Sequence, residues 1–163
     1  NLGTGAPSFK VLVAEDSVAY QMALQRLLSK HGADVTVVAD GGEAVDLVVT
    51  QGVCYNLALF DLNMAVMGGV EAMHRISDAA IELPIIAMTA SSLDEAQSQS
   101  YVDEGFSMVI TKPLRVSMCL EILARYGHVL PFGSNKQQPA MKSPSSFSST
   151  RALPRDDDLY ADG

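Results

Sequence analysis

Cysteine, long apolar runs and basic residues are all scarce in this chain, and each scarcity argues against a class of protein. The two cysteines, Cys54 and Cys119, are far apart and lie among apolar residues, so we expect buried free thiols rather than a disulfide or a metal site. No apolar run approaches the roughly 18 residues of a membrane span, and the N-terminus lacks the basic-then-apolar pattern of a signal peptide. We therefore expect a soluble, cytoplasmic protein.

Acidic residues outnumber basic ones, and the excess lies in one part of the chain. The sequence has 19 Asp and Glu against 11 Lys and Arg; four of each lie beyond residue 130, which leaves 15 acids against 7 bases before it. Direct binding to nucleic acid requires basic groups that displace counterions from phosphates, so this composition argues against it. An acidic body is better suited to binding cations.

The two ends of the chain lack the apolar periodicity of folded structure. Residues 1–8 are small and flexible and do not begin with methionine, so we interpret them as a linker from a larger protein. Residues 130–163 are rich in Pro, Ser, Gln and charged residues, and such a segment buries too little surface to offset its ordering entropy. The sequence therefore predicts one folded domain over residues 9–129, followed by a disordered tail.

Within that domain, short apolar segments alternate with helical patterns five times. The predicted strands are Phe9–Ala14, Asp34–Ala39, Leu57–Phe60, Pro84–Thr89 and Ser107–Thr111. Strict alternation of this kind predicts an α/β fold, a doubly wound parallel sheet with right-handed crossovers and helices on both faces. The helix that ends at Glu104 is the most polar, so we expect it to be largely exposed, and the spacing of Ser92 and Glu95 predicts a capping box at its start.

Polar residues follow the predicted strands at the points where they end. Glu15 and Asp16 follow the first strand, Asp61 the third and Lys112 the fifth, while Thr89 ends the fourth. Because the carboxyl ends of parallel strands meet at one edge of the sheet, we expect three carboxylates, a hydroxyl and an ammonium group to converge there.

Converging carboxylates require a counter-charge. Two of them about 4 Å apart repel by about 4 kcal/mol at an effective dielectric constant near 20. A divalent cation removes this repulsion, and hard oxygen ligands favour Mg²⁺, or Mn²⁺ in its place. In such a site Asp61 has the chemistry of a nucleophile that accepts a phosphoryl group, Lys112 would offset charge on the transferring oxygens, and Thr89 would hydrogen-bond to one of them.

Four blocks of the sequence are similar to one known family. VLVAEDS, LFDLNMAVMGGVEA, IIAMTA and VITKPL resemble the motifs of the response-regulator receiver domain of two-component signalling, over residues 9 to about 127. The resemblance implies a flavodoxin-like (βα)₅ fold with a five-stranded sheet in the order 2-1-3-4-5. It also implies that Asp61 is the phosphoacceptor and that Glu15 and Asp16 bind the metal, with the backbone carbonyl of Asn63.

By the same resemblance, Thr89 is the switch hydroxyl, Lys112 is the invariant lysine, and the Lys112–Pro113 bond is cis. Four positions depart from the usual pattern of the family. Glu15 stands where an aspartate is commoner, a change that we expect metal binding to tolerate. Ala65 and Gly68 stand where proline and aspartate are common, which predicts a more mobile loop after Asp61. Val109 stands where a switch aromatic is expected, which predicts that phosphorylation is relayed weakly or through another surface.

The sequence thus predicts a phosphoacceptor domain that receives a phosphoryl group from the phosphohistidine of a histidine kinase or a histidine phosphotransfer protein, and signals by conformational change. The alternative is a receiver-like interaction module that acts without phosphorylation. The domain alone is not expected to be a turnover enzyme. Its linker-like start favours the C-terminal receiver of a hybrid histidine kinase over a stand-alone regulator.

Overall fold

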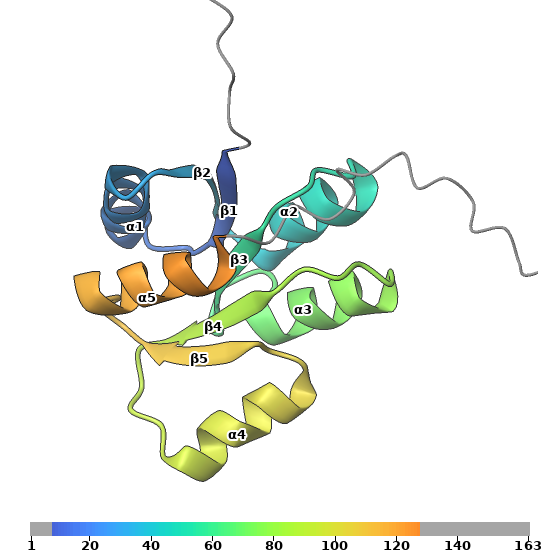
Figure 1. The fold of residues 1–163 in the computed structure, drawn as a ribbon. Helices are drawn as coiled ribbons and strands as arrows, with labels where there is room; N and C mark the ends of the chain where they lie inside the picture. The colour runs from blue at the N-terminus through green and yellow to red at the C-terminus, as the bar shows by residue number, and fades with distance from the viewer. Residues whose placement is uncertain (1–7, 128–163) are drawn as a thin grey trace, which may run out of the picture.

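Residues 8–127 of the chain are described by a computed structural model, and they form alternating strands and helices (Figure 1). The predicted linker and tail lie outside these residues, apart from Ser8, so both remain predictions. The strands are β1 Phe9–Ala14, β2 Ala33–Val38, β3 Leu57–Asp61, β4 Ile85–Thr89 and β5 Met108–Thr111. The helices are α1 Val18–Lys30, α2 Gly41–Val45 with its π-helical continuation η1 Asp46–Thr50, α3 Gly69–Asp78, α4 Glu95–Glu104 and α5 Val116–Tyr126.

The five strands form one parallel sheet in the order β2-β1-β3-β4-β5, which confirms the predicted fold class and strand order. The central strand β3 is buried along its whole length, as expected for a strand covered by helices on both faces. Register aligns the strand ends: Ala14 pairs with Phe60, Asp61 with Met88, and Thr89 with Thr111. The carboxyl ends of these strands therefore meet at one edge of the sheet.

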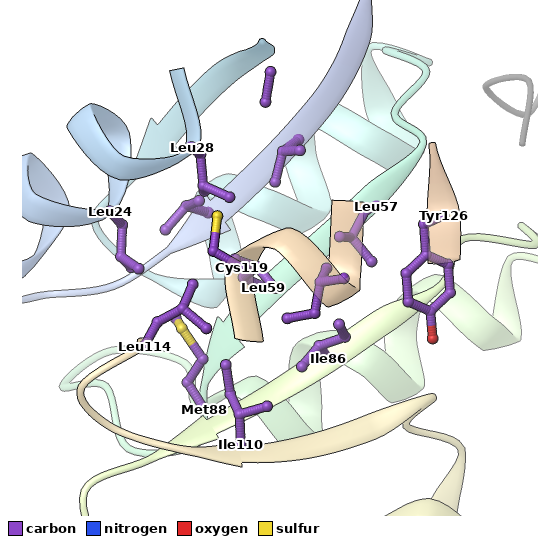
Figure 2. Close-up of a cluster of buried hydrophobic side chains, with 14 residues drawn as sticks. Leu24, Leu28, Leu57, Leu59, Ile86, Met88, Ile110, Leu114, Cys119 and Tyr126 are labelled. Carbon is purple, nitrogen blue, oxygen red and sulfur yellow. The ribbon is translucent and has the colours of Figure 1, made fainter. Parts of the chain in front are cut away.

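Two apolar clusters hold the helices against the two faces of the sheet. One cluster joins α1 and α5 to the sheet, and Figure 2 shows Leu24, Leu28 and Cys119 among its side chains. The other joins α2 and α3 to the opposite face, with Phe60 and Ile76 among its members. Full burial of a large aliphatic or aromatic side chain stabilises a fold by about 1.5–3 kcal/mol, so these clusters hold α1, α2, α3 and α5 in place on the sheet.

Two sequence expectations about local structure require correction, one at the start of α4 and one at Cys54. The capping box of α4 is formed by Asp94 and Gln97, not by Ser92 and Glu95: the Asp94 carboxylate accepts from the Gln97 N–H at 2.8 Å, and the Gln97 side chain accepts from the Asp94 N–H at 3.0 Å. The spacing of the motif is the same, but the helix begins later. Because both residues of either pair are polar, the spacing by itself did not distinguish them.

The buried face of α5 is formed by Cys119, Ile122 and Tyr126, whereas the apolar residues Val116 and Leu120 of the same helix are exposed. Cys119 is buried as expected, but Cys54 is only partly buried. The expected exposure of α4 is confirmed, since each of its residues is half-buried or exposed. Across the described residues, none of the helices has the length and apolar character needed to cross a membrane.

Candidate functional site

The carboxyl-terminal edge of the sheet gathers the acidic residues that the sequence singled out. Glu15, Asp16 and Asp61 each offer one carboxylate oxygen, and these three oxygens lie within 4.8 Å of one another. Glu15 and Asp16 follow β1, while Asp61 is the last residue of β3, the neighbouring strand. The predicted convergence of the three acids is therefore present in the structure.

Lys112 reaches this cluster from the end of β5. Its Nζ lies 2.5 Å from Glu15 Oε2 and 2.6 Å from Asp61 Oδ2. The side chains are 17% exposed for Lys112, 1% for Glu15 and 7% for Asp61, so both ion pairs are shielded from water. Burial alone would lower the pKa of Lys112, but the hydrogen bonds to Asp61 and Glu15 outweigh it and hold this pKa above its ordinary value.

Backbone N–H groups bind the remaining oxygens of the two buried acids. Ser17 N donates to Glu15 Oε1 at 3.0 Å, and Asn63 N donates to Asp61 Oδ1 at 3.0 Å. Both donors lie two residues beyond the acid that they contact, so the turn after each strand orients the carboxylate of that strand. Asn63 thus contacts Asp61 through its N–H group, a contact that was not predicted, and the metal-binding role of its carbonyl remains a prediction.

Thr89 lies at the end of β4 and is buried, with 2% of its surface exposed. Its Oγ1 accepts a hydrogen bond from Ser91 N at 3.1 Å, and its carbonyl accepts one from Lys112 N at 2.8 Å. A threonine hydroxyl can accept one bond and donate another, so Thr89 keeps an O–H donor for a further ligand. Its carbonyl also fixes the backbone from which Lys112 extends.

The loop between Asp61 and α3 packs closely against the start of α2. Gly41 N donates to Met67 O at 3.0 Å, and Gly69 N donates to Leu62 O at 3.3 Å. A Cβ atom on Gly69 would stand 2.5 Å from the Asp61 carbonyl oxygen, so only glycine fits there without a backbone shift. These contacts anchor both ends of the loop, and the predicted mobility remains a prediction.

Tyr20 is a site residue that sequence reasoning missed. It lies in the first turn of α1, where the centre of its ring is 4.9 Å from Lys112 Nζ and its hydroxyl accepts a hydrogen bond from Leu114 N at 2.9 Å. The available signal was its position one helical turn beyond Asp16, at the end of α1 nearest the site. Burial raises the pKa of Tyr20, which keeps the hydroxyl neutral.

The donor set suits a hard divalent cation. Three carboxylates and one ammonium group leave a formal excess of two negative charges, and oxygen is the ligand type that Mg²⁺ prefers. Within residues 8–127 every buried side-chain nitrogen and oxygen has a hydrogen-bond partner, so a cation would share or replace bonds that Lys112 now makes to Glu15 and Asp61. The residues that would hold it are Glu15, Asp16 and Asp61.

Val109, which stands where the resemblance leads us to expect an aromatic residue, comes three residues before Lys112. Val109 lies on β5, is partly buried and packs against the α2–α3 cluster. Beside it, residues 109–115 and Met118 line an open hollow of about 320 Å³. The Lys112–Pro113 bond within this segment is cis, as the resemblance implied.

Comparison with known proteins supports one family. Residues 11–124 match the family model described as the response regulator receiver domain. A two-component response regulator of Arabidopsis thaliana is 36% identical over 112 residues, covering 69% of this chain and 79% of that protein. A hybrid signal transduction histidine kinase of Dictyostelium discoideum is 31% identical over 121 residues, which are 70% of this chain but only 7% of the kinase.

One of the solved structures that resemble this chain is a complex of two proteins. The co-crystal structure of a Saccharomyces cerevisiae histidine phosphotransfer signaling protein with the receiver domain of its downstream response regulator matches with a TM-score of 0.65 and 26% identity. The match covers 74% of this chain and 90% of the matched chain.

Proposed function

The chain belongs to the response regulator receiver domain family, and from this we propose that Asp61 accepts a phosphoryl group from phosphohistidine in a two-component phosphorelay. The observation that carries the proposal is the arrangement around Asp61. Its carboxylate lies within 4.8 Å of the Glu15 and Asp16 oxygens and 2.6 Å from the ammonium group of Lys112. A carboxylate suited to act as a nucleophile, two further carboxylates suited to bind a metal ion, and a lysine ammonium group thus lie together.

The transfer itself forms one bond and breaks another. An Asp61 carboxylate oxygen donates an electron pair to phosphorus, and the phosphorus–nitrogen bond breaks, leaving its electron pair on the donor histidine, which takes up a proton. Asn63 N–H keeps the Asp61 carboxylate oriented. A Mg²⁺ ion held by Glu15, Asp16 and Asp61 would neutralise charge on the phosphoryl oxygens.

Lys112 and Thr89 act on the phosphoryl group after it arrives. The ammonium group of Lys112 already contacts Asp61 Oδ2, so a short movement takes it to a phosphoryl oxygen. Thr89 can donate its hydroxyl proton to another oxygen while it still accepts from Ser91 N. Movement of Thr89 would pull on its own backbone carbonyl, which binds Lys112 N, and this links the chemistry at β3 to the segment after β5.

The donor must approach the edge of the sheet, because Asp61 is only 5% exposed. Three valines around that edge are exposed: Val18 at 66%, Val66 at 80% and Val116 at 54%. They lie at the start of α1, in the loop after Asp61 and at the start of α5. We assign them to the docking surface for a histidine phosphotransfer domain, a type of partner that a solved receiver domain 26% identical to this chain binds.

Phosphorylation of Asp61 is tested with a small phosphodonor such as phosphoramidate and with Mg²⁺, followed by intact-mass measurement. The wild type should gain the mass of one phosphoryl group, and hydroxylamine should remove it because an acyl phosphate, unlike a phosphoserine, is cleaved by this nucleophile. Asp61→Asn should gain nothing, while Asp103→Asn, on the exposed helix α4, should behave as the wild type. A wild type that stays unmodified would refute the proposal.

Docking is tested separately by comparing two phosphodonors. Val18→Lys and Val66→Lys should slow transfer from a phosphorylated histidine phosphotransfer protein about tenfold or more, since a charge in an apolar contact costs more than about 1.4 kcal/mol. Phosphorylation by phosphoramidate should be unchanged. The control Val49→Lys alters an exposed valine of η1, which lies toward the opposite edge of the sheet, and should affect neither reaction. Equal transfer rates for all three variants would rule out this surface.

The alternative of an interaction module that acts without phosphorylation is not favoured by the family match. Beryllofluoride, an analogue of the phosphoryl group, offers a direct comparison, since failure to bind in the presence of Mg²⁺ is what that alternative predicts. Attachment to a hybrid histidine kinase and a cytoplasmic location stay predictions. The matched region is a small part of the Dictyostelium kinase, and the activity of any larger protein is outside it.

A further inference from the structure

Tyr20 contacts the segment after β5 in two different ways. The face of its ring lies 4.9 Å from Lys112 Nζ, which is within the range of a cation–π interaction. Its hydroxyl accepts a hydrogen bond from Leu114 N at 2.9 Å. One residue of α1 thus binds the functional group of Lys112 and also the backbone two residues beyond it.

The backbone of residues 112–114 has two N–H groups, because Pro113 has none. Lys112 N donates to Thr89 O at 2.8 Å, and Leu114 N donates to the Tyr20 hydroxyl. The segment that carries Lys112 is therefore held at one end by β4 and at the other by α1. Removing the hydroxyl would release the second of these two attachments.

The carboxylate partners of Lys112 change during the proposed reaction. In the structure its ammonium group is bound by Glu15 and Asp61, and both are candidate ligands of the cation. When a cation and a phosphoryl group occupy these carboxylates, Lys112 loses part of its support. The ring of Tyr20 is not a ligand for Mg²⁺ and bears no charge, so neither ligand would compete for its contact with the ammonium group.

We propose that Tyr20 is a positioning residue that holds Lys112 at the phosphoryl group when Glu15 and Asp61 bind the cation. This inference rests on the proposed function of Asp61. It assigns the ring face to the ammonium group and the hydroxyl to the backbone at Leu114. Tyr20 itself touches neither the cation nor the phosphoryl group.

A positioning role of Tyr20 can be distinguished from a purely structural one by measuring two affinities of the wild type and its variants by calorimetry. One is the affinity for Mg²⁺ alone, and the other is the affinity for beryllofluoride in saturating Mg²⁺. Tyr20→Leu removes the ring face and should weaken beryllofluoride binding about 5- to 30-fold, which corresponds to about 1–2 kcal/mol. The ring is not a ligand for Mg²⁺ and its removal leaves the charge of Lys112 in place, so the affinity for Mg²⁺ alone should stay within about twofold. Tyr20→Phe keeps the ring and loses only the hydroxyl, so its effect should fall between the wild type and Tyr20→Leu.

Two results would overturn the inference: Tyr20→Leu binding beryllofluoride as tightly as the wild type, or losing affinity for Mg²⁺ and beryllofluoride by the same factor. A measurement on the wild type needs no variant to fold. The ring should shift the ε-methylene proton resonances of Lys112 upfield in NMR spectra, both without ligands and with Mg²⁺ and beryllofluoride. If the ε-methylene protons of Lys112 have the chemical shifts of an ordinary lysine when Mg²⁺ and beryllofluoride are bound, the inference is contradicted. If the wild type fails to bind beryllofluoride at all, the proposed function fails instead.

Discussion

Replacing Lys112 by methionine should destabilise the metal-free protein strongly and the Mg²⁺-bound protein little. The variant keeps the length of the side chain and removes its charge, so the buried carboxylates of Glu15 and Asp61 lose their shared cation. Two unit charges 4.8 Å apart repel by about 3.5 kcal/mol at an effective dielectric constant near 20. Removing one partner of a buried ion pair typically costs about 3–5 kcal/mol, which agrees with this value.

We therefore expect the free energy of unfolding of Lys112→Met to be about 3 kcal/mol lower than that of the wild type, measured by urea denaturation in EDTA. Mg²⁺ supplies the missing positive charge, so the variant should bind it more tightly than the wild type does, and about 30-fold tighter binding corresponds to about 2 kcal/mol of extra stabilisation in saturating Mg²⁺. Repeating the titration in saturating Mg²⁺ should reduce the difference to about 1 kcal/mol or less.

The matched control is the ion pair between Arg75 and Glu71 on α3. Its nitrogen and oxygen are 2.6 Å apart, as in the pair between Lys112 and Asp61, but both side chains are more than half exposed. Arg75→Met should cost about 0.5 kcal/mol or less, and Mg²⁺ should not alter that cost. The reasoning is refuted if Lys112→Met is as stable as the wild type in EDTA, or if Mg²⁺ leaves its deficit unchanged.

Three further predictions concern Gly69, the two cysteines and the pKa of Lys112. Gly69→Ala should lower stability by about 1–3 kcal/mol and slow phosphorylation measured by intact mass, because its Cβ would stand 2.5 Å from the Asp61 carbonyl. Iodoacetamide at pH 8 should label Cys54 of the native protein well before Cys119, which is fully buried and whose thiol pKa is raised by burial. The pKa of Lys112 is raised above its ordinary value of 10.5, so the stability that its charge contributes is fully present below pH 10.5 and is lost as pH rises through the folded-state pKa. The urea midpoints of the wild type and Lys112→Met in EDTA should therefore converge over that rise in pH.

Each of these measurements has its own control. Gly42→Ala places a Cβ 2.9 Å from the Asp40 carboxylate oxygen that caps α2, so it should also lower stability but should leave the rate of phosphorylation unchanged. Labelling in denaturant should modify both cysteines at similar rates. For the titration, Arg75→Met should keep a constant offset from the wild type over the same pH range. The first prediction is contradicted if the two glycine variants are phosphorylated at the same rate. The second is contradicted if Cys54 and Cys119 of the native protein are labelled equally fast, and the third if the urea midpoints of wild type and Lys112→Met stay equally far apart at every pH.

The predicted fold depended on features that are local in sequence. The alternation of apolar strands with helical patterns predicts a doubly wound sheet, and the residues that follow each strand are then placed at a common edge by topology alone. That is why Glu15, Asp61 and Lys112 were predicted together although 97 residues separate the first from the last. Details that depend on where a helix begins, such as the capping box at Asp94, were not resolved by spacing.

The face that α5 buries shows where local pattern is insufficient. Val116 and Leu120 are as apolar as Ile122, yet they are exposed, because the angle at which α5 meets α1 and the sheet selects Cys119, Ile122 and Tyr126 for the interior. The same approach of α1 to the segment after β5 brings Tyr20 against Lys112. Residues 92 positions apart in sequence give no periodic signal of such a contact, which arises only when α1 packs beside the segment that follows β5.

By itself, the sequence determined the class of fold, the strand order through family resemblance, and the acids, hydroxyl and lysine of the site, because these follow from periodicity and from which residue ends each strand. Tertiary structure alone decided how the site is held. It paired Lys112 with both buried carboxylates, set the N–H groups of Ser17 and Asn63 against the other oxygens, and placed Tyr20 behind the ammonium group. These contacts depend on the distances between separate helices and strands. Those distances are set by packing and cannot be predicted from short stretches of the sequence.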